Sequence, residues 1–160
     1  MLRVGLGYDA HKLVRSRPLF LGGVRIPYGR GLEGHSDADV ILHAVVDSLL
    51  GAAGLPDIGS YFSNKDPRWK NVSSLVFLRE IRKILDRKKI KIVNIDAVLL
   101  AESPPVAGYI PKMKEKVAES LKVKVSQIGI KASTNEGMGF VGKKEGMASY
   151  AVALVNYPAR

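Results

Sequence analysis

The chain of 160 residues contains no cysteine. This absence excludes disulfide bonds and thiolate metal sites, so any bound metal must be held by histidine, aspartate or glutamate. Long hydrophobic runs are also missing, because no apolar segment approaches the roughly 18–20 residues of a transmembrane helix. The N-terminus enters an apolar run at once, without the pattern of a signal peptide. We therefore expect a cytoplasmic protein with no membrane partner.

Acidic residues are scarce relative to basic ones, 15 against 25, which gives a net charge of +10. Such a surplus suits either nucleic acid or a small polyanion such as a phosphorylated metabolite. The basic residues concentrate in 79–91 and 112–124, with the spacing of solvated helix faces and no aromatic interleaving. We expect the partner to be a phosphorylated small molecule and not nucleic acid.

The remaining composition, 46% hydrophobic, predicts one compact domain over residues 1–160. Periodicity predicts strands at about 2–9, 91–101, 128–133 and 147–157, helices at about 37–53, 74–86 and 111–121, and a hairpin of 19–21 with 24–26. The predicted class is α+β, an α/β sandwich in which a mixed sheet carries helices on one face, with the β-hairpin added.

All three histidines, His11, His35 and His43, lie in the first 43 residues, each beside carboxylates. Zinc-type ions prefer imidazole nitrogen and carboxylate oxygen. Asp9, His11 and His43 would supply three ligands and leave a fourth position open for a substrate oxygen, as in catalytic sites. Asp47 follows His43 by one helical turn, so we predict that it fixes the tautomer of His43 or orients another active-site group.

The same cluster has other interpretations. A metal-free acid–base pair could be built on His35 and Asp39. Ser36 with Asp39 resembles a capping box, which would place His35 and Ser36 at a helix N-terminus, where phosphate is attracted, or make Ser36 a plain N-cap.

A Gly-rich loop follows the strand predicted at 128–133. Thr134 and Asn135 offer hydroxyl and amide groups to a phosphate, and Glu136 offers carboxylate oxygen to a hard cation such as magnesium. The loop is not a Walker A motif, and no GxGxxG motif follows a strand.

Taken together, these segments resemble the family of 2-C-methyl-D-erythritol 2,4-cyclodiphosphate synthases, enzymes of the non-mevalonate isoprenoid pathway. The resemblance covers essentially the whole chain. The motifs that carry it are Gly5-Leu6-Gly7-Tyr8-Asp9-Ala10-His11, Gly22-Gly23-Val24-Arg25-Ile26-Pro27, Gly34-His35-Ser36-Asp37-Ala38-Asp39-Val40, Leu42-His43-Ala44, Leu49-Leu50-Gly51-Ala52-Ala53, Asp57-Ile58-Gly59, Ile110-Pro111, Gly139-Phe140-Val141-Gly142 and Glu145-Gly146.

The resemblance implies a homotrimer with active sites between neighbouring subunits. It assigns Zn²⁺ to Asp9, His11 and His43, and Mg²⁺ or Mn²⁺ on the substrate diphosphate to Glu136. His35 and Thr134 would stabilise the transition state. The resemblance also implies the substrate contacts. Ser36 would contact a phosphate, and the methylerythritol part would be held by Asp57, Ile58 and Gly59. A mobile loop would carry Phe62 to Asp66, and the cytidine would be surrounded by Ala101 to Ala107 with Ala132, Ser133 and Asn135. Phe140 and Lys143 would face a cavity on the threefold axis that could hold an isoprenoid ligand.

The chain departs from the family pattern in three places. Pro105 replaces a lysine and offers neither an amide hydrogen nor an ammonium group, and Gly137 replaces the lysine after the loop glutamate. Lys143 stands where arginine is common, so the bidentate fork is lost.

The implied reaction converts 4-diphosphocytidyl-2-C-methyl-D-erythritol 2-phosphate to 2-C-methyl-D-erythritol 2,4-cyclodiphosphate and CMP, which classes the enzyme as a phosphorus–oxygen lyase. The nucleophile is the substrate's own 2-phosphate, so catalysis consists of positioning and charge neutralisation. The alternatives are a zinc-dependent phosphohydrolase, in which the metal activates water, and a non-enzymatic basic nucleic-acid-binding protein.

Overall fold

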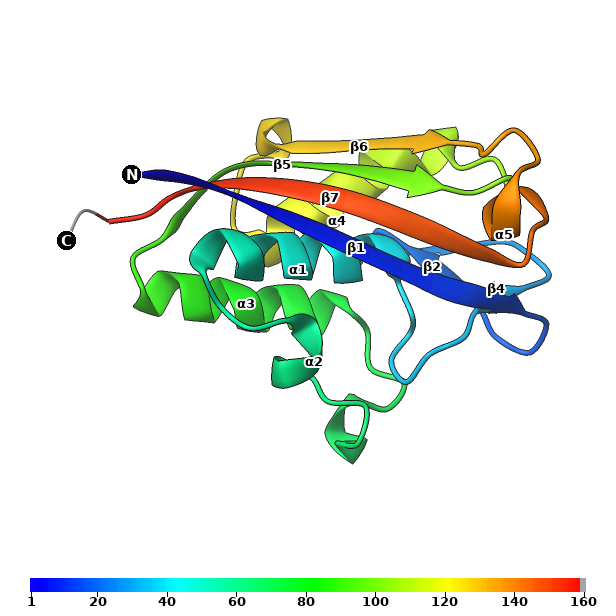
Figure 1. Ribbon diagram of the computed structural model, residues 1–160, viewed down its shortest axis with the longest axis horizontal. Helices are drawn as coiled ribbons and strands as arrows, with labels where there is room; N and C mark the ends of the chain where they lie inside the picture. The colour runs from blue at the N-terminus through cyan, green and yellow to red at the C-terminus, as the bar shows by residue number, and fades with distance from the viewer. Residues whose placement is uncertain (159–160) are drawn as a thin grey trace.

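The computed structural model describes residues 1–158, and one layer of it is a five-stranded sheet of strand order β4-β1-β7-β5-β6. The strands are β1 (Leu2–Val14), β4 (Gly31–Leu32), β5 (Lys91–Leu100), β6 (Ile128–Ser133) and β7 (Gly146–Asn156). Only β5 and β6 run parallel, whereas the other neighbours are antiparallel. The prediction of a mixed sheet is confirmed (Figure 1).

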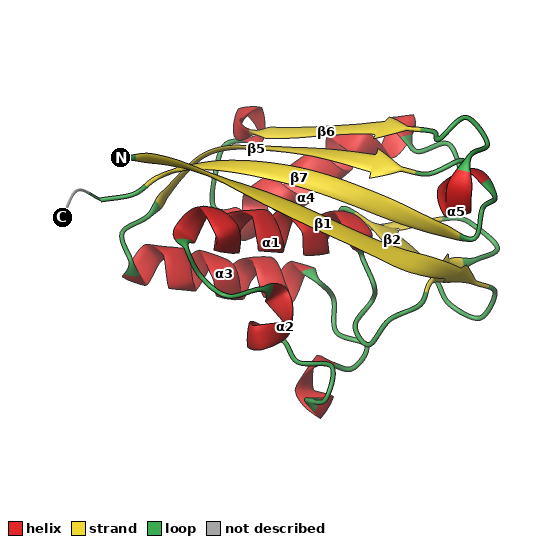
Figure 2. Cartoon of the chain, viewed as in Figure 1, coloured by secondary structure: helices red, strands yellow, loops and turns green. Residues whose placement is uncertain are grey.

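Three helices cover the same face of this sheet (Figure 2). They are α1 (Val40–Ala53), α3 (Leu75–Arg87) and α4 (Ile110–Leu121). Helix α1 contacts β1 and β7 on one side and α3 on the other, so nearly all of its side chains are buried. The prediction of helices on a single face is confirmed.

Two glycines let β1 lie unusually close to α1. A Cβ atom at Gly7 would lie 1.9 Å from the Ala44 carbonyl oxygen, and one at Gly5 would lie 2.0 Å from the Ser48 carbonyl oxygen. Only glycine permits this approach. It brings Asp9 and His11, which share a face of β1 with Gly5 and Gly7, against the side of α1.

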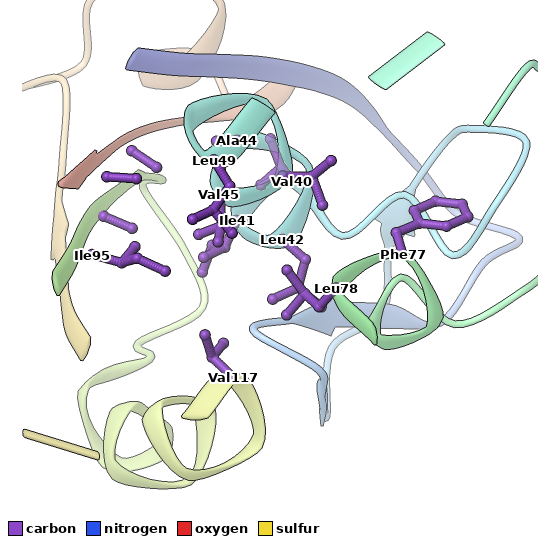
Figure 3. Packing of buried hydrophobic residues seen from close by; sticks show 14 of the residues in the cluster. Val40, Ile41, Leu42, Ala44, Val45, Leu49, Phe77, Leu78, Ile95 and Val117 are labelled. Atoms are coloured by element: carbon purple, nitrogen blue, oxygen red, sulfur yellow. The ribbon is translucent and has the colours of Figure 1, made fainter. Parts of the chain in front are cut away.

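The main core fills the space between the sheet and the helices. Figure 3 shows Leu42 of α1 beside Leu78 of α3, with Val117 of α4 below them. Ile95 closes this cluster from β5. The opposite face of the sheet remains apolar but exposed in the single chain, with Leu2, Val4, Leu6 and Tyr8 on β1 and Tyr150 and Val152 on β7.

The hairpin of β2 (Leu19–Leu21) and β3 (Val24–Ile26) is also confirmed, with Gly22 and Gly23 both at positive φ in its turn. It lies beside the start of α1. The N–H groups of Gly22 and Gly23 donate to the carboxylate of Asp39 at 3.0 and 2.7 Å.

Two predicted boundaries are wrong. Strand β1 continues to Val14, because its pairing with β7 extends through Lys12 and residues 13–14 pair with β4. Helix α1 begins at Val40 and not near residue 37, because Asp39 is its N-cap and accepts a hydrogen bond from the Leu42 N–H.

Five short helical segments escaped prediction because three or four residues carry no helical period: α2 (Ile58–Tyr61), η1 (Pro67–Trp69), η2 (Ala107–Tyr109), η3 (Val125–Gln127) and α5 (Gly139–Gly142). Among the residues that the structure describes, no helix is both long and apolar enough to cross a membrane.

Candidate metal centre and active site

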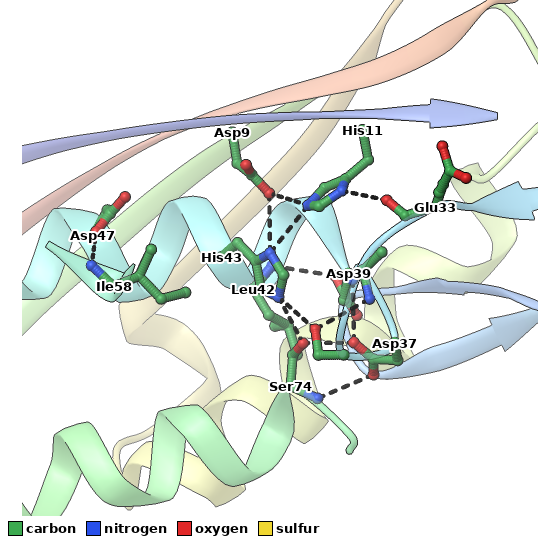
Figure 4. Close-up of polar contacts among 12 residues, drawn as sticks. Asp9, His11, Glu33, Asp37, Asp39, Leu42, His43, Asp47, Ile58 and Ser74 are labelled. Atoms are coloured by element: carbon green, nitrogen blue, oxygen red, sulfur yellow. Dashed lines mark hydrogen bonds and ion pairs between the residues drawn. The ribbon is translucent and has the colours of Figure 1, made fainter. Parts of the chain in front are cut away.

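Asp9, His11 and His43 converge although they come from a strand and a helix (Figure 4). The Oδ2 atom of Asp9 lies 2.8 Å from Nε2 of His11 and 3.0 Å from Nδ1 of His43. The two imidazole nitrogens are 3.2 Å apart. The side chains retain between 11% and 25% of their exposure, so the cluster is half-buried and open on one side.

This donor set fits a tetrahedral metal ion. Two ligand atoms at about 2.0–2.1 Å from zinc are separated by roughly 3.3 Å in a tetrahedron, which is close to the separation of the two imidazole nitrogens. All three residues offer a ligand atom within 4.8 Å of the others. The group could therefore hold a divalent cation with one position left open.

The tautomer of His11 is set by the backbone. Its Nδ1 lies 2.7 Å from the carbonyl oxygen of Glu33. A carbonyl only accepts, so Nδ1–H donates and the lone pair of Nε2 faces the cluster. Burial lowers the pKa of His11, but the hydrogen bond and charge of Asp9 outweigh it, and the net shift is upward. Burial also acts to raise the pKa of Asp9, but the two histidines lower it below its usual value.

A cavity of about 180 Å³ opens beside the cluster. Its wall includes the three residues of the cluster and the predicted site residues His35, Ser36, Ile58, Gly59 and Phe62. The other wall residues are Gly34, Asn64, Trp69 and Phe77. The structure thus brings most of the residues predicted for the metal and the polyol part of the substrate into one place.

Asp47 does not contact the imidazole of His43, so the expectation that it fixes that tautomer is wrong. Its Oδ1 instead accepts the N–H of Ile58 at 2.8 Å, as Figure 4 shows, and thereby holds the segment 57–59 against α1. Burial raises the pKa of Asp47 against the opposing effect of this hydrogen bond. Asp57 is the exposed N-cap of α2 and accepts the N–H and hydroxyl of Ser60 at 3.0 and 2.6 Å.

The segment 62–66 is anchored at both ends. Phe62 is buried and stacks on Phe77, with ring centroids 4.3 Å apart. The Nε2–H of His35 donates to the backbone oxygen of Asp66 at 2.9 Å, while the carboxylate of Asp66 pairs with Arg68 at 2.6 Å. Phe62 lies in the wall of the metal cavity, whereas Asp66 lies outside it.

The metal-free alternative is not formed in this structure. The Asp39 carboxylate is fully buried and is used by the N–H groups of Gly22, Gly23 and Leu42, while His35 bonds to Asp66. Burial and the nearby charge of Asp37 raise the pKa of Asp39, and the three N–H groups oppose this shift. Because Asp39 occupies the start of α1, the predicted placement of His35 and Ser36 at that helix end is wrong.

A second cavity, of about 390 Å³, lies at the ends of β5 and β6. Its wall consists of Ala101, Glu102, Pro104 to Ala107, Ile110, Ala132, Ser133 and Thr134. Most of these lie in the segments predicted around the cytidine, and Thr134 is the predicted catalytic residue, whereas Asn135, which was also predicted beside the cytidine, is not part of the wall. The two cavities share no wall residue. Within one chain, therefore, the predicted catalytic pair His35 and Thr134 is divided between two cavities.

The loop that carries Asn135 and Glu136 is held by Glu102. The Glu102 Oε1 accepts the N–H of Asn135 at 2.8 Å and that of Gly137 at 3.4 Å. These bonds clamp the loop on both sides of Glu136, whose φ of 51° is unusual for a residue with a side chain. Glu136 is exposed and lies outside the metal cavity.

Phe140 contributes to a third cavity, of about 440 Å³, together with Ala10, Lys12 and Gly146. Its ring is 42% exposed in the single chain. Lys143 is exposed and is not among the residues that form this cavity.

The supporting residues were missed from the sequence. Arg17 donates to the carbonyl oxygens of Gly34 and Ser36, Glu102 clamps the loop, and Ser74, which is bonded to Asp37, contacts His43. Asp37 lies next to Ser36 in the motif of residues 34–40, so that motif could have pointed to a role for Asp37 in the site. Arg17, Ser74 and Glu102 carry no local pattern that could have identified them.

Comparison with known proteins agrees with this geometry. The YgbB family model matches residues 2–156. The 2-C-methyl-D-erythritol 2,4-cyclodiphosphate synthases of Pelotomaculum thermopropionicum and Clostridium perfringens are 53% and 50% identical, covering 97% and 96% of this chain and 96% and 99% of theirs.

Solved structures are similar over the whole chain. IspF of Plasmodium falciparum, in a CDP complex, has a TM-score of 0.86 at 34% identity and covers 99% of this chain and 97% of that one. The bifunctional IspDF of Campylobacter jejuni has a TM-score of 0.89 at 35% identity, covering 99% of this chain and 43% of that chain.

The fold and the site define an α+β enzyme with a half-buried Asp–His–His cluster able to bind a metal ion. The chain belongs to the YgbB family, in which its curated relatives are cyclodiphosphate synthases.

Proposed function

We propose that this chain converts 4-diphosphocytidyl-2-C-methyl-D-erythritol 2-phosphate to 2-C-methyl-D-erythritol 2,4-cyclodiphosphate and CMP, as a single catalytic domain over residues 1–160. The observation that carries the proposal is the Asp9–His11–His43 cluster, built within a chain that matches synthases at about half identity over nearly its full length. The reaction closes a phosphate–phosphate bond inside one substrate and expels CMP, which makes the enzyme a phosphorus–oxygen lyase.

Asp9, His11 and His43 would hold Zn²⁺, and Glu136 would hold Mg²⁺ or Mn²⁺. Such cations act as Lewis acids on phosphoryl oxygens and orient the groups that react. Their charge balances the anionic oxygens of the diphosphate. The convergent lone pair of His11 and the carboxylate of Asp9 support this assignment for the first cation, and the exposed carboxylate of Glu136 leaves it accessible to the second.

The protein's own groups would orient the two reacting phosphates. His35 and Ser36 reach the metal cavity and could donate hydrogen bonds to a phosphate there. Ile58, whose N–H is held by Asp47, and Gly59 would offer a surface for the polyol, with Asp57 beside them. The segment from Phe62 to Asp66 would close over the substrate. Thr134 and Asn135 would face the diphosphate from the side of the cytidine cavity, where small side chains leave room for the base.

We propose that the functional form is a homotrimer in which the cytidine cavity of one subunit meets the metal cavity of the next. Two features support this. The two cavities have no residue in common within one chain, and the outer face of β1 and β7 exposes Leu2, Leu6 and Val152 to water. On the threefold axis, Phe140 and Lys143 would border a cavity for an isoprenoid ligand. The expected cytoplasmic location stays a prediction.

Product analysis tests the proposed reaction. The purified chain, supplied with Zn²⁺ and Mg²⁺, should release CMP and a cyclic diphosphate in equal amounts, as followed by ³¹P NMR. A zinc phosphohydrolase would give a linear phosphate instead. The nucleic-acid-binding alternative predicts no turnover of either kind. It also predicts tight, salt-dependent binding to DNA or RNA that survives chelation of the metal. These two results together would contradict the proposed enzymatic function.

Light scattering tests the trimer. The chain has a mass of 17.4 kDa, so three copies are readily distinguished from one. Leu6→Lys, at a side chain that is 65% exposed in the single chain, should dissociate the assembly. Val125→Lys, at a 43% exposed position in η3, is the matched control and should leave it intact. A monomeric parent protein would contradict the proposed assembly.

A further inference from the structure

Ser74 begins helix α3 without capping it. An N-cap serine ordinarily accepts a hydrogen bond from an N–H of the first helical turn, and this stabilises the helix by about 1 kcal/mol. Ser74 is the N-cap residue, yet its side chain makes no capping hydrogen bond. It is fully buried, so its hydroxyl must be satisfied in another way.

The hydroxyl hydrogen of Ser74 goes to Asp37. The Ser74 hydroxyl donates to Oδ1 of Asp37, and the Ser74 backbone N–H donates to Oδ2 at 3.0 Å. A carboxylate accepts and does not donate, so both hydrogens belong to Ser74. The carboxylate thereby fixes the direction of the hydroxyl. Figure 4 shows Asp37 beside Ser74.

The lone pairs of Ser74 then face His43. Its Oγ lies 2.9 Å from Nε2 of His43, and Ser36 Oγ lies 3.1 Å from the same nitrogen. Because the Ser74 hydrogen is already used, Ser74 accepts and Nε2 carries the hydrogen. The lone pair of the neutral imidazole is then on Nδ1, the atom that faces Asp9 and His11.

The two histidines of the cluster therefore differ in how they are oriented. A backbone carbonyl, which can only accept, fixes His11. Hydroxyl groups can donate or accept, so Ser74 fixes His43 only while Asp37 holds its hydrogen. Burial of Ser74 and His43 strengthens such a network, because water does not compete for its hydrogen bonds.

We propose that Ser74 and Asp37 are positioning residues that fix the tautomer and ring orientation of His43 and so set the metal affinity of the Asp9–His11–His43 cluster. This inference rests on the proposed function, because it requires that the cluster bind zinc. Ser74 and Asp37 act through His43 and do not themselves touch the metal. Groups that orient a metal-binding histidine typically change metal affinity 10–100-fold when they are removed.

Zinc affinity, measured on the full chain by competition with a chromophoric chelator, is the first test. Ser74→Ala should weaken zinc binding by about 10–100-fold. Ser73→Ala is the matched control, because Ser73 is the adjacent, exposed serine, whose Oγ accepts only a long 3.4 Å hydrogen bond from Leu75. It should bind zinc as the parent protein does.

Asp37→Asn tests the same chain of contacts without changing side-chain size. In the parent protein each Asp37 oxygen accepts one hydrogen bond from Ser74. An amide replaces one of these oxygens by an NH₂ group, which only donates, so one of the two acceptors of Ser74 is lost. Zinc affinity should fall as in Ser74→Ala. Circular dichroism should show the parent content of helix and strand in each variant that is compared.

The Nε2–H proton of His43 provides a spectroscopic test, since three histidines give a simple imidazole spectrum. In the zinc-loaded parent protein and in Ser73→Ala, this proton should exchange slowly with solvent. In Ser74→Ala its resonance should shift and its exchange should accelerate. Parent-like affinity and an unchanged His43 resonance in folded Ser74→Ala would overturn the inference alone. Failure of the parent chain to bind zinc would overturn the proposed metal site, and this inference with it.

Discussion

The cavity beside the Asp9–His11–His43 cluster and the cavity that we propose for the cytidine are built in different ways. Around the metal cavity, Asp9, His11 and His43 are half-buried and bonded to one another, and each histidine has a partner at its second ring nitrogen. Around the cavity proposed for the cytidine, most of the wall residues have small side chains, and Glu136 nearby along the chain is exposed. The metal cavity has its three candidate ligands within one chain. The cavity proposed for the cytidine is, we propose, completed by its ligand and by a neighbouring subunit.

The difference has a physical cause. A cation site needs several donors fixed within tenths of an ångström, which requires burial and hydrogen bonds behind each ligand. A nucleoside cavity needs shape and backbone groups, which small residues at strand ends can supply. The two halves should therefore respond to different substitutions.

The largest effect is expected for His43→Ala. Removing one of three protein ligands should weaken zinc binding by more than about 100-fold, and turnover should fall with it. Helix α1 should survive, because it packs through Val40, Ala44 and Val45. Zinc content reports on the metal cavity, and calorimetric binding of CMP reports on the cavity proposed for the cytidine. CMP binding should be retained in the variant. Full zinc occupancy in the variant would rule out the ligand assignment.

Gly7→Ala should damage the metal half through the backbone. The new methyl group would meet the Ala44 carbonyl, so β1 and α1 must separate, at a cost of about 1–3 kcal/mol or more. Thermal unfolding should show a drop of several degrees, with weaker zinc binding. Gly29→Ala is the control, because a Cβ there meets no atom within 4 Å. Equal melting temperatures for the two variants would show that the close approach is not needed.

A smaller effect, limited to the cytidine half, is expected for Glu102→Ala. The N–H groups of Asn135 and Gly137 would lose their acceptor, and the loop that carries Glu136 should loosen. The KM for the cytidyl substrate should rise about tenfold, which corresponds to the loss of one hydrogen bond of about 1–1.5 kcal/mol. Glu102→Gln keeps an accepting oxygen and should behave like the parent protein. A fall in zinc content in Glu102→Ala would contradict the independence of the two halves.

The smallest effect is the pH dependence of the metal-free protein. The pKa of His11 is raised above its ordinary 6.5 by Asp9, despite burial. Protonated His11 therefore favours the folded state, and this contribution is fully present below pH 6.5 and is lost as the pH rises through the folded-state value. NMR titration of the His11 ring should give a midpoint above 6.5, and Asp9→Asn should bring it down. A midpoint at or below 6.5 in the parent protein would contradict the pairing.

The predicted role of the basic surplus, to attract a phosphorylated small molecule, stays a prediction. The positive charges of 79–91 and 112–124 lie mainly on the outer sides of α3 and α4, where several pair with carboxylates, as in Lys83 with Glu80 and Lys112 with Glu115. Paired surface charges of this kind contribute little to stability.

The sequence by itself determined the fold class, the main strands and helices, the glycine hairpin and the Asp9–His11–His43 set. Each of these is carried by local periodicity, turn chemistry or residue type, which neighbouring residues reveal. Through the resemblance of whole motifs it also named Ala101, Ala107, Ala132 and Ser133, which the structure brings to one cavity, while their contact with cytidine stays a prediction.

Only the tertiary structure decided how those residues are held. Asp39 caps α1 and binds the hairpin, Asp47 holds Ile58, and Ser74 joins Asp37 to His43. These partners lie up to 37 positions apart in the chain, so no spacing rule connects them. Which acceptor a buried hydrogen reaches depends on how the helices and strands pack, and that is fixed by the whole core at once.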